Sequence, residues 1–508
     1  MAYLKTTALA AVLAATGGFA QAQDIKVAMD QVFHTLDPQD SNYNVDFSSM
    51  EGVFERLISF DEDMGLVPQL ATEWEANDDA TQFTLTLREG VVFHDGTPFN
   101  AEAVKANLER LADQSQNLAK NSMFNMVDSV EAPDETTVVI NLKEPFGAMI
   151  NTLAHPAVVM HSPASLEKGD VGDNPVGTGP FRFDEWVPGE QLRVVANEDY
   201  WDSEWPKVDS VTFYPVPENA TRVSMLLSDE VQFVYVLPAE LAENVESNDK
   251  YEVLSREGLT VWTAAMNMNK EYFQDPKVRE AFNLVVDQEA FLQVVYSGHG
   301  SVPDSPIAPN TQFHEAQEPA LSSDVERARE LMEEAGYGDG FEVEIWARNN
   351  STEVRMLQFL KQQLSQINVD ATVLPLEGAT RSERLFGSNV DPETIEYDLA
   401  IGGWSPSTGD ADWHLRPVYA TEGFIPNMYN MAFYSNEVVD GAVADALATA
   451  DPEARAEAYA KAQAQIWADQ PAIFLAVDEK MAGRKVGVSG IIKMPDGTMQ
   501  YSHVAVEE

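Results

Sequence analysis

The sequence predicts an α/β protein made of several folding units, and three observations support this. The chain has 508 residues, which at roughly 150 residues per domain allows about three units and cores that need no disulfide or metal. Residues 23–260 contain strand-like segments broken by turns. After Trp262 helical segments alternate with short strands, which is typical of α/β domains.

Strands are expected in the first part wherever polar and apolar residues alternate between turn-forming residues. These segments are 24–29, 81–87, 136–142 and 193–213, the last being two strands joined by a turn. One helix is expected over residues 101–112. Its apolar residues Val104, Leu108 and Leu111 fall on one face, so this helix is expected to cover a sheet.

The second part carries clear helix signals. Ser323 and Glu326 form a capping box, and Gly336 supplies the stop for that helix. Asp451 followed by Pro452 opens a helix that ends near Asp469. The expected helices are 276–296, 324–335, 353–367 and 452–469, and the expected strands are 341–346, 369–374, 397–401 and 473–477.

The charge of the chain excludes several classes of function. There are 83 acidic and 32 basic residues, for a net charge of -51. A surface of this sign repels phosphate backbones and anionic lipids, so nucleic-acid binding and membrane attachment are not expected. The sequence has no cysteine, which excludes disulfides, thiolate nucleophiles and a lipid anchor on cysteine.

The N-terminus has the features of a signal peptide. Lys5 precedes an apolar stretch over 8–20, and Ala20-Gln21-Ala22 has the small-x-small form of a cleavage site. We expect residues 1–22 to be removed after Ala22, so that the mature, non-lipidated protein lies in the periplasm. The alternative is a buried N-terminal helix. No other apolar stretch is long enough to span a membrane.

No catalytic motif is evident. The eight histidines lack the HExxH spacing, and neither a GxSxG elbow nor a phosphate-binding GxxxxGK[ST] loop occurs. We therefore expect no enzyme, no cofactor and no metal site. A periplasmic peptide hydrolase stays open as the alternative from another class, because catalytic residues can be distant in sequence.

The first candidate site is the segment 402–413, expected to be a loop after the strand 397–401. Ligands in α/β domains sit in such loops. Its indoles would supply rigid walls, its hydroxyls would donate hydrogen bonds, and an acid would hold an ammonium group. Alternatively, Trp404 packs in the core and the two acids cap the following helix. The candidates are Trp404, Ser407, Thr408, Asp410, Asp412 and Trp413.

The second candidate is Arg355, one turn into the helix that follows Asn349 and Asn350. An anionic protein repels a carboxylate ligand at long range, so capture needs a local guanidinium or a helix N-terminus. Arg381 and Arg384 are further candidates of the same kind. The alternative for Arg355 is a solvated helix face.

Several motifs resemble a known family. The segments 87–99, 175–181, 197–201, 266–269, 276–281 and 328–336 are similar to the peptide-binding class of periplasmic proteins of bacterial ABC importers, whose members bind dipeptides, oligopeptides, nickel or glutathione. The segments 150–157, 403–413 and 432–436 resemble the glutathione-binding members in particular. In the dipeptide and oligopeptide binders an aspartate three residues after the loop tryptophan holds the ligand amine. Here that position is Ser407, which shifts the expected acid to Asp410 or Asp412.

The resemblance implies a two-lobed, Venus-flytrap α/β fold. Lobe one would comprise 23–265 and 478–508, with a strand-rich subdomain inserted at about 52–174, and lobe two would comprise 266–477. A monomer would capture glutathione or a similar small peptide between the lobes and deliver it to an inner-membrane ABC permease. General dipeptide, oligopeptide or nickel-chelate binding is the alternative. Besides the loop residues and Arg355, the expected contacts are Gly177, Thr178, Gly179 and Asn267.

Overall fold

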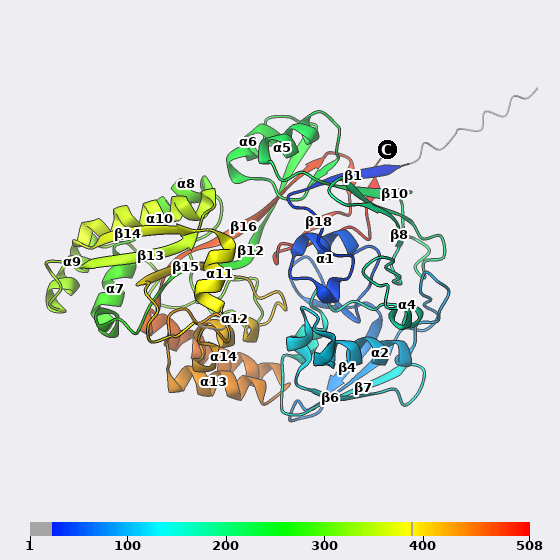
Figure 1. Cartoon of the computed structure of the whole chain (residues 1–508), viewed down its shortest axis with the longest axis horizontal. Coiled ribbons are helices and arrows are strands. Elements are labelled where there is room, and N and C mark those ends of the chain that lie inside the picture. The colour runs from blue at the N-terminus through cyan, green and yellow to red at the C-terminus, as the bar shows by residue number, and fades with distance from the viewer. Residues whose placement is uncertain (1–22, 388–389, 508) are drawn as a thin grey trace, which may run out of the picture.

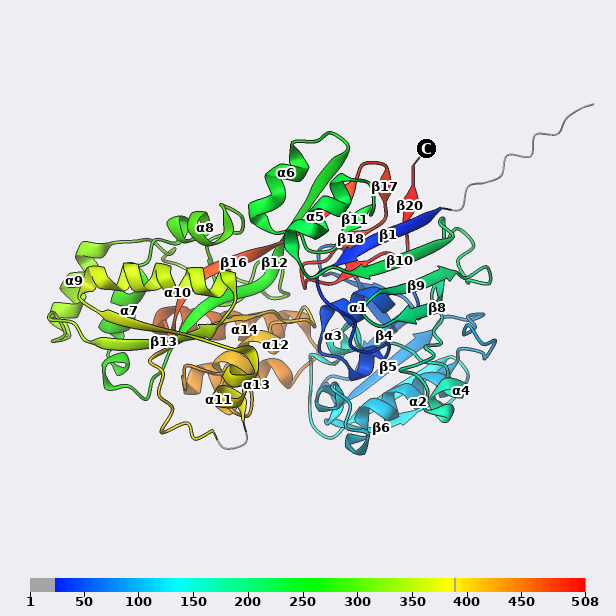
Figure 2. The same ribbon diagram turned by 45° about the horizontal axis from the view of Figure 1, so that its top comes forward.

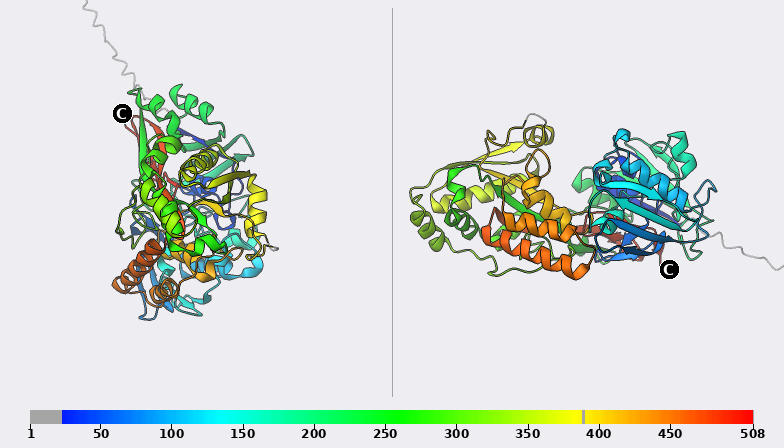
Figure 3. Two further views of the ribbon diagram at one scale, coloured as in Figure 1. Left: turned by 90° about the vertical axis from the view of Figure 1, so that its left-hand side faces the viewer. Right: turned by 90° about the horizontal axis from the view of Figure 1, so that it is seen from below.

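The computed structural model describes residues 23–387 and 390–507. The expected signal peptide, 1–22, lies outside the described residues. The chain forms two bodies side by side, seen most clearly from below in Figure 3. We call the body that contains β1 (Asp24–Met29) lobe one and the body that contains β13 (Glu342–Arg348) lobe two. The two-lobed α/β architecture expected from the resemblance is therefore present.

One mixed sheet of ten strands runs through both lobes (Figure 1). Its central strands pass from one lobe to the other, and its outer strands belong to one lobe each. In spatial order the strands are β14 (Asp370–Leu376), β13, β15 (Leu399–Trp404), β12 (Tyr251–Met266), β16 (Ala472–Lys485), β11 (Phe233–Val234), β1, β10 (Ser210–Pro215), β9 (Gln191–Ala196) and β8 (Phe181–Val187).

The two lobes are linked by the long antiparallel strands β12 and β16. Their pairing runs from Tyr251 opposite Lys485 to Ala265 opposite Ala472, with a break in register between Glu257 and Val261. Such irregularities bend a strand pair locally. The domain boundaries expected at 265/266 and 477/478 fall inside these two strands, and they stay a prediction.

Lobe two has helices on both faces of its part of the sheet (Figure 1). Alternate side chains of β12 enter different cores: Ala264 packs with α7 to α10, whereas Ala265 packs with α12 to α14. This is the consequence of the two-residue repeat of a strand. The helices are α7 (Pro276–Leu284), α8 (Gln288–Tyr296), α9 (Val325–Glu334), α10 (Ser351–Leu364), α11 (Gly378–Phe386), α12 (Asp412–Tyr419), α13 (Glu437–Leu447) and α14 (Pro452–Asp469).

Lobe one combines its half of the large sheet with a separate four-stranded antiparallel sheet (Figure 2). That sheet has the order β4 (Ala71–Ala76), β5 (Gln82–Leu87), β7 (Thr137–Leu142) and β6 (Val127–Glu131). The expected helix 101–112 is confirmed as α2 (Ala101–Ala112), and Val104, Leu108 and Leu111 are buried in the core beside it.

The remaining helices of lobe one are α1 (Asn44–Met50), α3 (Met149–Leu153), α4 (Pro163–Lys168), α5 (Asn219–Leu227) and α6 (Ala242–Glu246). Two-stranded pairs complete it: β2 (Ile58–Phe60) with β3 (Leu66–Pro68), β17 (Val488–Ser489) with β20 (Ala505–Val506), and β18 (Ile492–Lys493) with β19 (Met499–Gln500).

Three local expectations were wrong in detail. The single helix over 276–296 is two helices, because the Asp287 side chain accepts the Ala290 N–H and starts a second one. The N-cap of α9 is Asp324 and not Ser323, since its carboxylate accepts the Arg327 N–H. The strand 397–401 instead forms β15 and continues to Trp404, so the expected loop 402–413 begins as strand and ends as the first turn of α12.

Candidate functional site

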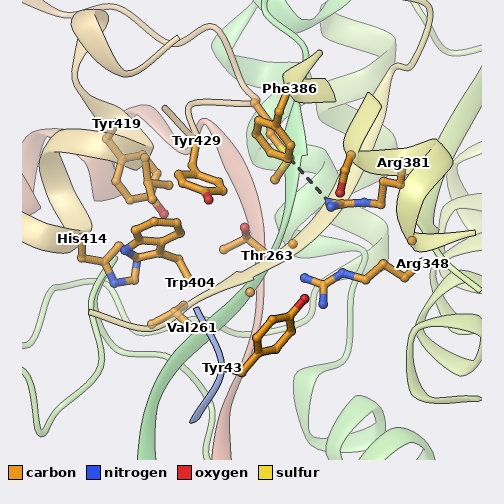
Figure 4. A pocket seen from close by; sticks show the side chains of 16 residues that line it. Tyr43, Val261, Thr263, Arg348, Arg381, Phe386, Trp404, His414, Tyr419 and Tyr429 are labelled. Atoms are coloured by element: carbon orange, nitrogen blue, oxygen red, sulfur yellow. Dashed lines mark hydrogen bonds between the residues drawn. The ribbon is translucent and has the colours of Figure 1, made fainter. Parts of the chain in front are cut away.

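A cavity of about 620 Å³ lies on the lobe-two side of the junction between the lobes (Figure 4). Its floor comes from the crossing strand β12 and from the end of β15, where glycines bring the backbone close to neighbouring side chains. The lining comprises Tyr43, Val261, Thr263, Arg348, Gly378, Arg381, Ser382, Phe386, Gly402, Gly403, Trp404, His414, Val418, Tyr419, Tyr429 and Met431.

Two kinds of side chain face each other across this cavity. Figure 4 shows the guanidinium groups of Arg348 and Arg381 on one side and a group of aromatic rings that includes Trp404 and Tyr429 on the other. The rings of Trp404 and Tyr429 are 4.2 Å apart between centroids. Tyr43 is contributed by lobe one, and its hydroxyl points toward Arg348 (Figure 4). The cavity therefore offers planar cationic donors and flat apolar walls to one guest.

Arg381 is the most buried cation of this cavity, with 6% of its surface exposed. Its Nη2 donates to the Ile401 carbonyl at 2.8 Å, whereas its buried Nε has no hydrogen-bond partner among the described residues. Burial, followed by the charge of Arg348, lowers the pKa of Arg381 to about 10. The side chain is still charged at neutral pH. A carboxylate brought into the cavity would compensate the buried charge and would give the Nε–H a hydrogen-bond acceptor.

Arg348 stands at the end of β13 with its side chain about half exposed. Its Nε lies 3.5 Å from Oε1 of Glu353. That carboxylate also accepts the Arg348 backbone N–H and the side chain of Asn350. Glu353 therefore holds the base of the arginine, and the rest of the guanidinium faces the cavity.

His414 closes the aromatic side as a neutral ring. Burial lowers the pKa of His414 to about 3, and its ring is nearly parallel to that of Tyr419 at 6.1 Å. Neither His414 Nδ1 nor the Tyr419 hydroxyl has a hydrogen-bond partner within residues 23–387 and 390–507. Both groups are thus available to polar atoms of a guest.

A second cavity of about 630 Å³ adjoins the first, because Trp404 and Tyr429 line both. Side chains from both lobes line it. Lys120 of lobe one donates its Nζ to Asn42 at 2.8 Å, and burial lowers the pKa of Lys120 to about 8. The lining comprises Asn42, Ala119, Lys120, Ser122, Met123, Asn125, Met126, Phe146, Thr152, Trp404, Ser405, Ser407, Trp413, Arg416, Pro417, Asn427, Met428 and Tyr429.

Four of the residues predicted from the sequence line these cavities, and Arg381 lines the first. Trp404 lines both, while Ser407 and Trp413 line the second. The indole N–H of Trp404 donates to the backbone carbonyl of Trp413, which fixes the position of one ring relative to the other. Fixed aromatic rings give a guest contact area without a large loss of side-chain entropy.

The other predicted residues of segment 402–413 already have partners within the protein, Asp410 and Asp412 inside lobe two and Thr408 across to lobe one. Nη2 of Arg455 lies 2.9 Å from the Asp410 carboxylate, which is fully buried. Asp412 is bound by Arg416 through two hydrogen bonds of 2.8 Å each. Thr408 is buried, with its carbonyl accepting from Asn151 of lobe one. None of the three is among the residues that line either cavity.

The predicted contacts of lobe one are also buried away from both cavities. A Cβ at Gly177 would lie 2.1 Å from the Val53 carbonyl oxygen, and one at Gly179 would lie 2.3 Å from that of Gly52. These glycines therefore allow two backbone segments to touch. Thr178 between them is buried as well.

Asn267 and Arg355 make contacts within lobe two. The Asn267 amide donates to the Tyr397 carbonyl at 2.9 Å. Arg355 donates to the Val295 carbonyl at 3.2 Å, which ties α10 to α8. Neither residue lines a cavity described above. The structure thus brings Trp404, Ser407 and Trp413 together with Arg381, and leaves Arg355 apart.

Three cationic residues of the cavities, Arg348, Arg416 and Lys120, were missed by sequence reasoning. Arg348 follows the expected strand 341–346 by two residues, and the rule that ligands sit beyond strand ends would have identified it. Lys120 lies in lobe one, about 280 residues before Trp404 in the sequence, and no local pattern marks it. Its place depends on how the lobes meet.

Within residues 23–387 and 390–507, no cluster of three or more His, Asp or Glu side chains has an arrangement that could hold a metal ion. No helix within those residues combines the length and apolar character needed to cross a membrane.

Comparison with known proteins gives a consistent result. Residues 65–425 match the family described as bacterial extracellular solute-binding proteins, family 5 Middle. The glutathione-binding protein GsiB of Pectobacterium atrosepticum is 38% identical over 490 residues, covering 96% of this chain and 95% of the relative. Among solved structures, HbpA2 from Haemophilus parasuis is similar with a TM-score of 0.85 and 25% identity, covering 96% of this chain and all of that one. DppA from Helicobacter pylori in complex with the peptide STSA has a TM-score of 0.78 and 24% identity, with coverage of 96% and 99%.

Proposed function

We propose, on the premise that this chain belongs to the family 5 bacterial extracellular solute-binding proteins, that its ligand is glutathione or a similar small peptide. The chain is a periplasmic substrate-binding component of an ABC importer. Its 38% identity to proteins named glutathione-binding supports the ligand. The observation that carries the proposal is the pair of guanidinium groups, Arg348 and Arg381, that faces an aromatic wall across the cavity.

The arginines suit one end of such a ligand. A planar guanidinium binds a carboxylate through two parallel hydrogen bonds, and Arg381 holds a buried Nε without a partner in the described structure. Trp404 and Tyr429 would cover the apolar face of the ligand backbone. Micromolar affinity corresponds to about 8 kcal/mol, which two or three charge-assisted contacts and this burial can supply.

We propose that the ligand is held by closure of the two lobes. Lobe one, 23–265 with 478–508 and carrying the subdomain at about 52–174, would rotate against lobe two, 266–477, by bending β12 and β16. Tyr43 of lobe one lines the first cavity opposite residues of lobe two such as Arg348, and the second cavity, which Lys120 lines, has walls from both lobes. A ligand that touches both lobes prefers the closed form, and only such a preference shifts the equilibrium.

The remaining parts of the proposal concern delivery. We propose that the protein acts as a monomer and leaves its ligand chemically unchanged. We also propose that an inner-membrane ABC permease accepts the closed form. Export would remove residues 1–22, and the mature protein would carry no lipid. N-terminal sequencing of periplasmic protein should begin at Gln23. Incubation with glutathione or a tetrapeptide should return the compound intact by mass spectrometry, and turnover would favour the hydrolase alternative.

The ligand is tested by calorimetry and thermal unfolding of the mature protein. Glutathione, several dipeptides, a nonapeptide and nickel with histidine form the panel, the last because His414 lines the cavity. At a concentration of 100 times Kd a ligand stabilises the folded state by about 2.7 kcal/mol. We expect glutathione to give the largest rise in Tm. A larger rise in Tm with dipeptides, or with nickel and histidine, would mean that those compounds and not glutathione are the ligand.

A further inference from the structure

The two adjoining cavities differ in charge from the rest of the protein. The chain has 83 acidic and 32 basic residues, yet no lining residue of either cavity in the described structure is an Asp or Glu. The lining does include four basic residues: Arg348, Arg381, Lys120 and Arg416. The lining of these two cavities is thus positive in a chain whose net charge is -51.

Three acids of the described chain lie within 4.0 Å of a cation in this lining. Both oxygens of Asp412 accept from Arg416, whose Nη1 is also 3.9 Å from Glu422, and Glu353 lies 3.5 Å from Nε of Arg348. Arg416 is therefore neutralised by Asp412. The donors left for a guest are Arg381 and the Nη groups of Arg348 in the first cavity and Lys120 in the second. Among the described residues, no salt-bridge partner lies within 4.0 Å of Arg381 or Lys120.

The three cations lie at two separate places. Arg348 and Arg381 share the first cavity with the aromatic rings, as Figure 4 shows. Lys120 lies beyond Trp404 and Tyr429, the two residues common to both cavities. A guest that fills both cavities would thus place one acidic group at the arginines and another near Lys120. A free ammonium in the same space would meet three like charges and no carboxylate.

We propose that the joined cavities select small molecules with two separated acidic groups and do not require a free amino group. The inference deepens the proposed function and rests on it for the location of the ligand. It extends the ligand class to acidic compounds whose nitrogen is acylated, such as N-acetylated acidic dipeptides. The amino group of glutathione is then tolerated at the solvent side or by carbonyl oxygens and contributes little to affinity.

The test is calorimetry of the mature protein with four compounds at pH 7. They are glutathione, N-acetylglutathione, the dimethyl ester of glutathione, and N-acetyl-aspartyl-glutamate. We expect N-acetylation to change Kd by less than about threefold and esterification to raise it at least about 30-fold. We also expect N-acetyl-aspartyl-glutamate to bind. A 30-fold loss on N-acetylation, or unchanged affinity of the diester, overturns the inference.

The outcomes separate this inference from the proposed function. Tight binding of glutathione with loss on N-acetylation leaves the proposed function standing and removes the inference. Binding of N-acetyl-aspartyl-glutamate without binding of glutathione would support the inference and would remove glutathione as the proposed ligand. Binding of neither compound overturns both.

Two variants sharpen the result. Lys120→Met should weaken binding of N-acetyl-aspartyl-glutamate at least about tenfold, while Lys105→Met, on α2 and outside both linings, should leave it unchanged. Ser407→Asp would place a carboxylate in the second cavity. We expect it to weaken glutathione and N-acetylglutathione to the same extent, because it repels their carboxylates and the amino group contributes little. A clearly smaller loss for glutathione would place its ammonium beside residue 407 and overturn the inference.

Discussion

Two groups of arginines in lobe two differ in where their countercharge comes from. Arg416 and Arg455 each meet an aspartate of the chain at 2.8 to 2.9 Å. Arg381 has no carboxylate at such a distance within the described residues, and Arg348 has one at 3.5 Å. The first group is satisfied by the fold itself, and the second keeps donor capacity for a guest. Residue type alone therefore does not separate a stabilising charge from a binding charge.

The largest effect is expected from removing a countercharge of the first group. Asp410→Ala leaves Arg455 buried without its carboxylate, with only 4% of its side chain exposed. Breaking a buried pair in this way costs about 3–5 kcal/mol in the free energy of unfolding, measurable by urea titration. Asp445→Ala, at an exposed aspartate of α13, is the control and should stay within about 0.5 kcal/mol. A loss of ligand affinity without a loss of stability would instead make Asp410 a ligand contact.

The second prediction concerns the binding charge. Arg381→Met should weaken glutathione binding at least about 30-fold, since the ligand carboxylate loses its buried partner. The free energy of unfolding should not fall, because the variant removes a desolvated charge. Arg384→Met is the matched control on the same helix; Arg384 lies over the Trp346 ring and is not among the cavity-lining residues. Calorimetry and urea titration separate the two effects, and equal losses in both variants would contradict the assignment.

The third prediction uses the neutral histidine of the same cavity. The pKa of His414 is about 3 in the folded protein and about 6.5 when unfolded. This depressed value contributes stability that is fully present above pH 6.5 and is lost as pH falls toward 3. At pH 5 the loss is about 2 kcal/mol relative to pH 7. Urea titrations at pH 7 and pH 5 should show that the free energy of unfolding of His414→Gln falls by about 2 kcal/mol less than that of the unchanged protein. An identical fall in both proteins would show that this ring is not buried in its neutral form.

The fourth prediction concerns the cation of lobe one. Lys120, with a pKa of about 8, loses its proton as pH rises from 7 to 9. Affinity for N-acetyl-aspartyl-glutamate, whose groups do not titrate in this range, should then fall by up to about tenfold. Lys120→Arg keeps its charge and should remove the dependence. A fall that persists in this variant would assign the titration to another group.

The smallest effect is expected at Arg355. Its contact with the Val295 carbonyl lies between two helices, so Arg355→Ala should change ligand affinity by less than about twofold. The free energy of unfolding should fall by about 1 kcal/mol for the lost hydrogen bond. A tenfold loss of affinity in calorimetry would return Arg355 to the ligand contacts that its place in sequence suggested.

The elements that could be predicted are those with local signals. The helix 452–469 is marked by Asp451 and Pro452, and α14 has these bounds because the Asp451 carboxylate accepts the N–H groups of Glu453 and Ala454. The helix over 276–296 could not be separated into two, since Asp287 is a cap only once the chain turns there. Local pattern thus decides where helices form more reliably than where they break.

The site was predictable in part for a similar reason. Trp404, Ser407 and Trp413 lie in one segment after a strand, so their grouping is local. The ion pair that engages Asp410 is not local, because its partner Arg455 comes 45 residues later in the sequence. Lys120 enters through the meeting of two lobes. Sequence reasoning therefore found the wall of the cavity and missed most of its charge.

The break in register between Glu257 and Val261 has a mechanical consequence. Val261 and Thr263, in the same strand, form the floor on which a guest would rest. A ligand on that floor would thus lie only a few residues from an irregularity in the pairing of the two strands that link the lobes. If the lobes close by bending there, as we propose, the same strand would carry both the contact with the ligand and the bend that changes the shape offered to a permease.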